Sequence, residues 1–342
     1  MVPEPGRRVG WRWTWQPPGP TFSPCRRDWH PSRARVLYLR ATKGNTMGNL
    51  KLRRQRRALA AGLASLAMAV GLAAVPAQAA EKTKYIALGD SYAAGQGAGP
   101  YLDGCYRSGN TYSELAAADK AIKLVTNAAC SGKTTQEVVA TQLRQLNKST
   151  ELVTITAGGN NLGFGEIVTT CGDPVLVAAC AQATAKATTL LTSGQLAGDV
   201  AAMIRSVQAA APNAKIVLTG YPYLFDPFNL DPADRMAPFI YQATALANAL
   251  NKNIAGAAAA IDPDAARVKY VDVRAAFAGH GINSADPWIN GAIPDSPDSF
   301  HPNAKGYEAY FTALSSAGAY SAPERRLASR NSRPARNPSC AR

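Results

Sequence analysis

A serine that could act with an aspartate and a histidine to hydrolyse an ester stands far from these two residues in the sequence. Ser91 follows a short apolar run in YIALGDSYAAGQG (85–97), and Asp298 and His301 stand in DSPDSFHPNAKGY (295–307). A serine hydroxyl is a weak nucleophile that needs an adjacent base, and an aspartate can orient the histidine that serves as this base. Alone, a serine after a strand is typical of a turn or a helix cap. The case for chemistry therefore depends on the rest of the chain.

Acyl transfer also needs hydrogen-bond donors aimed at the developing oxyanion. The backbone N–H groups of Ser91 and of Gly132 in AACSGKT (128–134) have the right chemistry, as does the side-chain amide of Asn160 in GGNNLGF (158–164). Each piece also has a structural interpretation. Gly132 alone is typical of a turn, Asn160 of a loop cap, His301 of a surface position before a helix, and Asp90 of a residue that bonds loop backbone.

Five short apolar runs, separated by helical patterns, would position these residues. The predicted strands are 84–88, 122–126, 152–157, 215–220 and 268–273, and the predicted helices are 134–147, 196–207, 234–260 and one after Pro302. Strands that alternate with helices indicate an α/β fold, a parallel sheet with helices on both faces. Ligands bind at the carboxyl ends of such strands, where these segments would meet. We expect 164–193 to be an insertion over the sheet rather than a second domain.

The order of these segments resembles the SGNH, or GDSL, hydrolase superfamily, and within it the secreted actinomycete lipases and esterases. The likeness covers about residues 83–316 and rests on Gly89-Asp90-Ser91, Gly132, Gly158-Gly159-Asn160 and Asp298 to Pro302. The resemblance implies a three-layer flavodoxin-like fold with a five-stranded parallel sheet, and no metal or cofactor. It assigns Ser91 as nucleophile and first oxyanion donor, Gly132 and Asn160 as further donors, His301 as base and Asp298 as its orienter.

Two features depart from the family pattern. Asn161 stands where the third block usually ends in aspartate, which puts the local loop structure in question. Similar secreted lipases often carry three disulfides, whereas residues 80–322 contain four cysteines: Cys105, Cys130, Cys171 and Cys180. In an exported chain four cysteines suggest two disulfides, and proximity favours Cys105–Cys130 and Cys171–Cys180 among three possible pairings. A zinc site is the alternative, but no CxxC pair supports it.

The positive charge of the chain is concentrated at its two ends. The net charge is +14, of which residues 1–79 contribute +12 and residues 323–342 contribute +5. The middle, 80–322, has 17 basic and 20 acidic residues, a net charge of −3. A mildly acidic globular part argues against a nucleic-acid partner.

Residues 47–79 have the order of a secretory signal peptide. Five basic residues between Lys51 and Arg57 precede an uncharged stretch, and Ala77-Gln78-Ala79 has the form of a cleavage site. An uncleaved membrane anchor is the alternative. Residues 1–46 are expected to be an over-extended gene-model leader, with a genuine basic leader as the alternative. Residues 323–342 are expected to form a basic disordered tail after the hydrolase domain at 80–322.

These observations predict a secreted, extracellular serine hydrolase that cleaves carboxylic esters through an acyl-enzyme. The alternatives are a carbohydrate O-acetyl esterase or phospholipase with the same machinery, or an inactive secreted binding module, which the intact Ser, His and Asp set opposes. We expect a small-molecule or lipid ester as substrate, no stable membrane insertion after processing, and a monomer. Five apolar residues near the strand ends could form an acyl-binding wall or simply pack the loops: Leu162, Phe164, Tyr223, Leu224 and Phe225.

Overall fold

The structure, a computed structural model, describes residues 81–171, 175–228 and 230–321. All of them belong to one compact unit, Val75–Arg342. The expected leader at 1–46, signal peptide at 47–79 and tail at 323–342 lie outside the described residues. Within the described part of the chain, no helix combines the length and the apolar character needed to cross a membrane.

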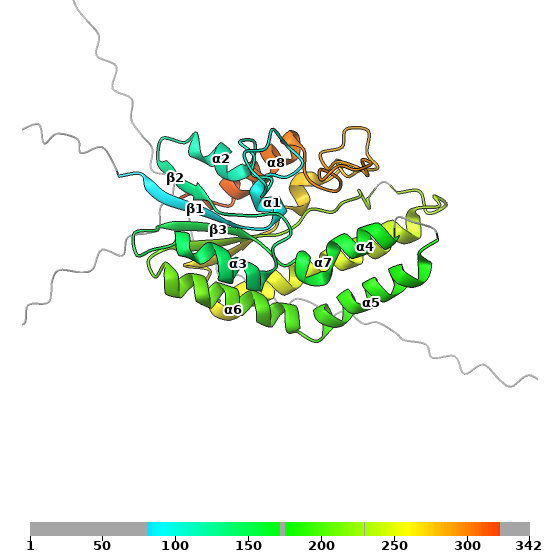
Figure 1. The fold of residues 1–342 in the computed structure, drawn as a ribbon, viewed down its shortest axis with the longest axis horizontal. Coiled ribbons are helices and arrows are strands. Elements are labelled where there is room, and N and C mark those ends of the chain that lie inside the picture. Colours follow the sequence, from blue (N-terminus) through cyan, green and yellow to red (C-terminus); the bar gives the residue numbers. More distant parts are fainter. Residues whose placement is uncertain (1–80, 172–174, 229, 322–342) are drawn as a thin grey trace, which may run out of the picture. The chain divides into compact units, whose positions relative to one another are not determined.

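A five-stranded, wholly parallel sheet forms the centre of the fold (Figure 1). Its strands are β1 (Thr83–Gly89), β2 (Ile122–Asn127), β3 (Leu152–Thr156), β4 (Lys215–Thr219) and β5 (Val268–Val271), in the order β2-β1-β3-β4-β5. Every predicted strand is present. The order is that of flavodoxin-like sheets, so the fold prediction is confirmed. The order reverses between β1 and β3, and ligands bind at the carboxyl ends of such a pair.

Helices cover both faces of the sheet, as predicted. In Figure 1, α3, α6 and α7 lie on one side of the strands, and α2 and α8 lie on the other. The helix bounds are α1 (Ser91–Ala94), α2 (Tyr112–Ala117), α3 (Thr135–Gln142), α4 (Phe164–Cys171), α5 (Val177–Thr192), α6 (Gln195–Ala210), α7 (Ala237–Ile261) and α8 (Ala304–Ser316), with short 3₁₀ turns η1 (Leu143–Gln145), η2 (Asn160–Leu162) and η3 (Arg274–Phe277).

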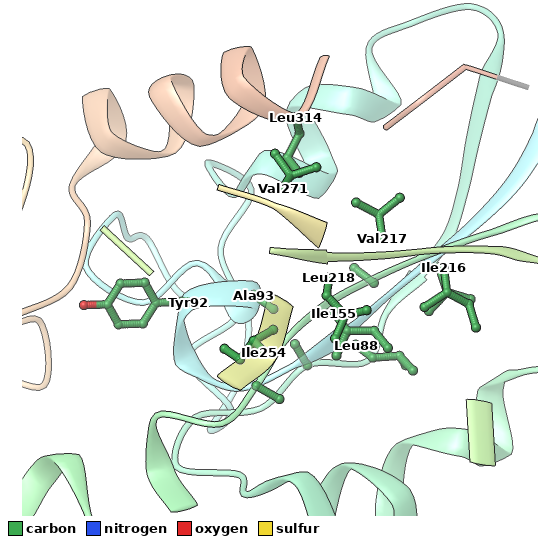
Figure 2. Packing of buried hydrophobic residues seen from close by; sticks show 14 of the residues in the cluster. Leu88, Tyr92, Ala93, Ile155, Ile216, Val217, Leu218, Ile254, Val271 and Leu314 are labelled. Carbon is green, nitrogen blue, oxygen red and sulfur yellow. The ribbon is translucent and has the colours of Figure 1, made fainter. Parts of the chain in front are cut away.

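The core lies between the sheet and both helical layers. All five residues of β3 are buried, so side chains on both faces of this strand are covered. Leu88, Ile155 and Leu218 are register neighbours on adjacent strands and share one face. Val217 lies on the other face, on the side of Leu314 of α8 (Figure 2). A sheet buried on both faces explains why the strands read as continuous apolar runs rather than as alternating patterns.

The stretch 164–193 belongs to the same unit, as expected, but it does not lie over the sheet. Its helices α4 and α5 pack against each other, and α5 also packs against α6 and α7. Figure 1 shows both helices beyond the carboxyl ends of the strands. The physical reason is that α6 and α7 already occupy that face, so the insertion extends the helical layer past the strand ends.

Both predicted disulfides are present. Cys105 pairs with Cys130, and Cys171 pairs with Cys180. The first joins the loop after α1 to the loop after β2, and the second joins the end of α4 to the first turn of α5. In an oxidising compartment, each stabilises the fold by restricting the unfolded chain, by about 2–4 kcal/mol.

Candidate active site

Ser91 lies at the point where β1 ends and α1 begins. Gly89, the last residue of β1, has φ of 133°, and a Cβ there would lie 2.1 Å from the carbonyl oxygen of Thr156. Only glycine permits this approach. The N–H of Asp90 then donates to the same Thr156 carbonyl at 2.9 Å, which ties the turn to β3. Ser91 is thereby held in a tight strand-to-helix turn with its side chain 7% exposed.

His301 lies within hydrogen-bond distance of Ser91, although 210 residues separate them. Its Nε2 is 2.8 Å from Ser91 Oγ, and its Nδ1 is 2.8 Å from the carbonyl oxygen of Ser299. A carbonyl oxygen only accepts hydrogen bonds, so Nδ1 carries the proton and Nε2 is left as the acceptor. This tautomer is the one that can take a proton from a serine hydroxyl.

The predicted contact between Asp298 and His301 is not made. The Asp298 carboxylate accepts a hydrogen bond from the Tyr101 hydroxyl, and the Tyr101 oxygen in turn accepts one from the Gly97 N–H at 2.9 Å. The backbone turn in which the His301 N–H donates to the Asp298 carbonyl at 3.2 Å brings the Ser299 carbonyl to Nδ1 instead. The expectation that Asp298 orients the ring is therefore corrected: a backbone carbonyl does so.

Burial decides the charge state of His301. Desolvation lowers its pKa to about 4, because it outweighs the hydrogen bond to Ser299 and the negative charge of Asp298, both of which raise the pKa. The imidazole is consequently neutral at pH 7, as a general base must be.

Gly132 and Asn160, the predicted oxyanion donors, line one cleft with Ser91 and His301. The loop that carries Gly132 is fixed to the end of β1, since the Cys130 N–H donates to the Gly89 carbonyl at 3.1 Å. The Asn160 side-chain nitrogen donates to the Lys133 carbonyl at 3.1 Å. An amide nitrogen carries two hydrogens, so this bond fixes the group and leaves a second donor.

Asn161, the departure from the family pattern, joins the third block to the start of α3. Its Oδ1 accepts from the Thr135 N–H at 3.0 Å, and its Nδ2 lies 2.9 Å from Thr135 Oγ1 and 3.0 Å from Gln136 Oε1. An aspartate could not donate to Gln136. The asparagine therefore supplies a local anchor for the loop that carries Asn160.

A buried network links Asp90 to the Asn160 loop. The Tyr221 hydroxyl donates to Asp90 Oδ2 at 2.5 Å and accepts from the Gly159 N–H at 3.1 Å, while Asp90 Oδ1 accepts from the Tyr92 N–H at 3.0 Å. Burial raises the pKa of Asp90 to about 7, against the opposing effect of these hydrogen bonds. Asp90 thus bonds loop backbone, as its structural interpretation predicted.

A large apolar pocket opens beside Ser91. It encloses about 930 Å³ of empty space, part of it open to solvent. Its apolar walls come from η2, α4, the segment after β4 and α7, and include Leu162, Phe164, Ile167, Leu224, Phe239 and Leu246. Three of the five suggested acyl-wall residues take part. Tyr223 instead contacts Phe228 and Phe225 contacts Phe239, so these two pack the loop.

The described residues contain no group of three or more His, Cys, Asp or Glu side chains that could hold a metal ion. Cys105, Cys130, Cys171 and Cys180 are all paired in disulfides.

Comparison with known families gives the site its context. The sequence profile of the GDSL-like lipase/acylhydrolase family matches residues 87–309. The chain belongs to this family. The matched range begins in β1 and ends in α8, so it contains every residue of the GDSL-family site described above.

Curated relatives of this GDSL-family enzyme are lipases. A lipase from Streptomyces rimosus is 33% identical over 285 residues, which cover 78% of this chain and 100% of the relative. Lipase 1 from Streptomyces coelicolor is 35% identical over 256 residues, 72% of this chain and 90% of the relative. These relatives and the family establish that the enzyme is a carboxylic ester hydrolase of the lipase/esterase type.

Solved structures agree with this assignment. The crystal structure of an extracellular lipase from Streptomyces rimosus has a TM-score of 0.61 at 33% identity and covers 69% of this chain and 99% of its own. That of phospholipase A1 from Streptomyces albidoflavus NA297 has a TM-score of 0.62 at 35% identity, with the same two coverages. Both therefore match the GDSL-family enzyme over almost their entire length.

Several residues that support the site were not predicted from the sequence. The Tyr92 hydroxyl donates to the Phe300 carbonyl at 2.6 Å, and its ring centroid lies 5.2 Å from that of His301. Phe300 adopts φ of 63°, an unfavourable value for a bulky residue, so this contact helps to hold the histidine loop. Tyr221 stands at the carboxyl end of β4, a position that could have drawn attention to it. Nothing in the sequence marks Tyr101 as a partner of Asp298.

Proposed function

We propose that Ser91 is the nucleophile and His301 the general base and acid of a secreted serine esterase or lipase. The observation that carries this proposal is the 2.8 Å hydrogen bond between Ser91 Oγ and His301 Nε2, on a ring whose Nδ1 proton is held by the Ser299 carbonyl. A neutral imidazole in this tautomer is ready to accept the serine proton.

The reaction proceeds in two halves. Ser91 Oγ attacks the ester carbonyl carbon while its proton moves to His301 Nε2, and the N–H groups of Ser91 and Gly132 and the Asn160 amide stabilise the oxyanion. Collapse breaks the bond to the alcohol oxygen, which takes the proton from His301 and leaves an acyl-enzyme. Water then attacks the acyl-enzyme with His301 again as base, and the carboxylic acid is released.

The apolar pocket favours an acyl chain longer than acetyl. Its apolar walls come from four segments, η2, α4, the segment after β4 and α7, and an acetyl group is too small to contact all of them. Each buried methylene contributes about 0.8 kcal/mol, so a longer chain gains binding energy in proportion to its buried length. A lipase or esterase is therefore better supported than a carbohydrate O-acetyl esterase. A phospholipid is also a carboxylic ester and would use the same pocket.

Two measurements test the nucleophile and the acyl preference. A serine-directed organophosphonate should label Ser91 in the wild type, and Ser91→Ala should lose hydrolysis while its circular dichroism and melting temperature stay close to those of the wild type. Hydrolysis should be measured on nitrophenyl esters from acetate to palmitate and on an acetylated sugar polymer. We expect kcat/KM to reach its maximum at an acyl chain longer than acetyl. Activity that survives in Ser91→Ala, with label on another serine, would overturn the assignment.

The expected secretion has its own test. Residues 47–79 have the signal-peptide order, and the similar lipase from Streptomyces rimosus is described as extracellular. N-terminal sequencing of the exported protein should give a start just after Ala79. A mature start before Met47 would contradict the proposal.

A further inference from the structure

A second hollow meets the apolar pocket at the nucleophile. The apolar pocket described above is called the acyl pocket from here on. The second hollow, called the histidine cleft, encloses about 1150 Å³ of empty space and is more open to solvent. Both hollows are lined by Ser91 and Asn160 and by Phe164 and Val168 of α4. An ester bound at Ser91 therefore has two directions in which its halves can extend.

The position of His301 decides which half takes which direction, given the proposed function. His301 lines the histidine cleft and is not among the residues that line the acyl pocket. In the first half-reaction His301 must give its proton to the alcohol oxygen as the bond to the carbonyl carbon breaks. The alcohol half must therefore lie on the side of His301, and the acyl chain lies in the other hollow.

The chemistry of the histidine cleft is mainly apolar and carries no formal charge. Phe164 and Val168 form one side, and Ile293, Pro294 and Phe300 form part of the other. Its polar side chains are hydroxyls, an amide and the neutral imidazole of His301: Ser91, Ser131, Thr169, Ser299 and Asn160 supply the hydroxyls and the amide. Among the described residues that line it, none has a carboxylate, an ammonium or a guanidinium group.

The charged groups that neighbour the cleft in sequence are engaged elsewhere or lie outside the lining. The Asp298 carboxylate accepts from Tyr101, and the Lys133 ammonium pairs with Glu137 at 3.1 Å. Asp295 follows Pro294 in sequence but is not among the lining residues. A cation in the cleft would lose hydration without meeting an opposite charge, which is costly, whereas a hydrocarbon would gain by leaving water.

We propose that the histidine cleft is the alcohol site and that it selects esters whose alcohol half is uncharged and apolar, with Ile293 as a specificity-determining residue. Ile293 is 44% exposed, so its side chain forms part of the rim rather than of the core. Its backbone N–H donates to Ser299 Oγ at 2.9 Å and its carbonyl accepts from the same hydroxyl at 3.0 Å. These backbone bonds do not depend on the side chain, so substitutions at Ile293 should leave the loop in place.

A matched pair of esters isolates the charge of the alcohol. Butanoylcholine and 3,3-dimethylbutyl butanoate have the same shape and differ by a quaternary nitrogen in place of a carbon, and methyl butanoate supplies a reference with almost no alcohol half. The quantity measured is kcat/KM, divided by the rate constant of hydroxide-catalysed hydrolysis for each ester, which removes the difference between leaving groups. We expect the neutral ester to exceed butanoylcholine by about tenfold, the result of an unpaired cation in an apolar site.

Variants at Ile293 then place the selection in the cleft. Ile293→Asp should raise kcat/KM for butanoylcholine and lower it for the neutral ester, so that the ratio of the two kcat/KM values changes by about tenfold. Ile293→Asn has the size of the aspartate without its charge. It should lower kcat/KM for the neutral ester without raising kcat/KM for butanoylcholine. Val177→Asp, on α5 and outside both hollows, controls for net charge and should leave the ratio unchanged.

The outcomes separate this proposal from the proposed function. Equal or faster normalised hydrolysis of butanoylcholine by the wild type, or an Ile293→Asp ratio equal to that of the wild type, would overturn the alcohol site while Ser91-dependent hydrolysis of methyl butanoate stands. If methyl butanoate hydrolysis survives in Ser91→Ala, the proposed function itself fails.

Discussion

Replacing Asp298 by asparagine should cost the enzyme little, because the Asp298 carboxylate does not touch the histidine. The Nδ1 proton of His301 is held by the Ser299 carbonyl at 2.8 Å, which the substitution leaves intact. What the substitution removes is one negative charge near the ring and the charge-assisted bond from the Tyr101 hydroxyl. The asparagine oxygen can still accept from Tyr101, so a weaker neutral bond replaces the stronger one.

The size of the effect follows from these two changes. Exchanging a charged for a neutral hydrogen bond costs about 1 kcal/mol, and every 1.4 kcal/mol is tenfold in rate. The lost charge also disfavours the imidazolium that forms in the transition state. We expect kcat/KM at pH 7 to fall by about twofold to tenfold. Where a carboxylate contacts Nδ1 directly, as in a serine protease triad, the same substitution costs about ten-thousandfold.

The pH profile adds a second, signed expectation. The proposed general base, His301, must be neutral to act, and burial lowers its pKa to about 4, so kcat/KM of the wild type should fall only as the pH drops through about 4. Asp298 raises this pKa, so Asp298→Asn should move the acid limb to still lower pH. Tyr101→Phe removes the other partner of the same bond, and the double variant should lose little more than either single variant.

The assay is kcat/KM on one short-chain ester from pH 3.5 to 8 for the wild type, Asp298→Asn, Tyr101→Phe and the double variant. His301→Ala, which removes the proposed base, should lower kcat/KM by at least about a thousandfold, and this loss is the reference for the other variants. A loss of a thousandfold or more in Asp298→Asn, with an unchanged circular dichroism spectrum, would refute the reasoning. It would mean that the carboxylate reaches Nδ1 in the working enzyme.

Substitutions at three further positions test the residues that hold the site. Asp90→Asn should change how stability depends on pH. Burial raises the pKa of Asp90 to about 7, so between about pH 4 and 7 the folded wild type keeps a proton that the unfolded chain releases. The contribution of Asp90 to the free energy of unfolding therefore falls as the pH rises through this range. Urea unfolding of both proteins should show that the free energy of unfolding of the variant rises by about 2–4 kcal/mol relative to that of the wild type between pH 4 and 7. Parallel plots of unfolding free energy against pH would contradict this. Asn161→Ala should lower kcat more than it raises KM and should cost about 1–2 kcal/mol of stability, because the loop that carries Asn160 loses its anchor on α3. Asn161→Asp keeps the hydrogen bond from the Thr135 N–H, so its kcat and its stability should lie between those of the wild type and of Asn161→Ala. Steady-state kinetics and thermal melts measure both quantities, and a change confined to KM would count against the anchor. Gly97→Ala should lower kcat/KM by about a hundredfold, because at φ of 97° its Cβ would lie 2.4 Å from the Pro302 carbonyl oxygen and 2.8 Å from His301 Cβ. Unaltered kinetics would show that the histidine loop can move to accommodate the methyl group.

The sequence was sufficient to predict the sheet and the meeting of the site residues, for one physical reason. All five strands are parallel, so the segments that follow them must gather at one edge, and Ser91, Gly132 and Asn160 each follow one of these strands. Strands buried on both faces also produce uninterrupted apolar runs, which are easy to recognise. The disulfide pairing followed from proximity, because pairing neighbouring cysteines two by two along residues 80–322 gives Cys105–Cys130 and Cys171–Cys180.

The hydrogen-bond partner of His301 could not be predicted in the same way. Asp298 and the Ser299 carbonyl stand three and two residues before the ring, and the torsions of a few loop residues decide which of them reaches Nδ1. That choice also depends on Tyr101, which lies 197 residues away from Asp298 in the sequence. The Tyr101 hydroxyl donates a hydrogen bond to the Asp298 carboxylate. Sequence spacing carries no information on such a contact. The same holds for α7, whose Phe239 and Leu246 line the acyl pocket far from any motif.

Three tyrosines explain how a buried base stays neutral and yet precisely oriented. Tyr92 bonds the Phe300 carbonyl, Tyr101 bonds Asp298, and Tyr221 bonds Asp90, so each phenol joins a segment near Ser91 to another part of the site. Burial lowers the pKa of His301, and a cationic donor at these positions would lower it further while adding its own desolvation cost. A phenol donates the same hydrogen bond without a charge, and its ring supplies the apolar surface that excludes water. Neutral donors of this kind therefore meet two demands on the site: they position the histidine loop, and they add no positive charge near the imidazole.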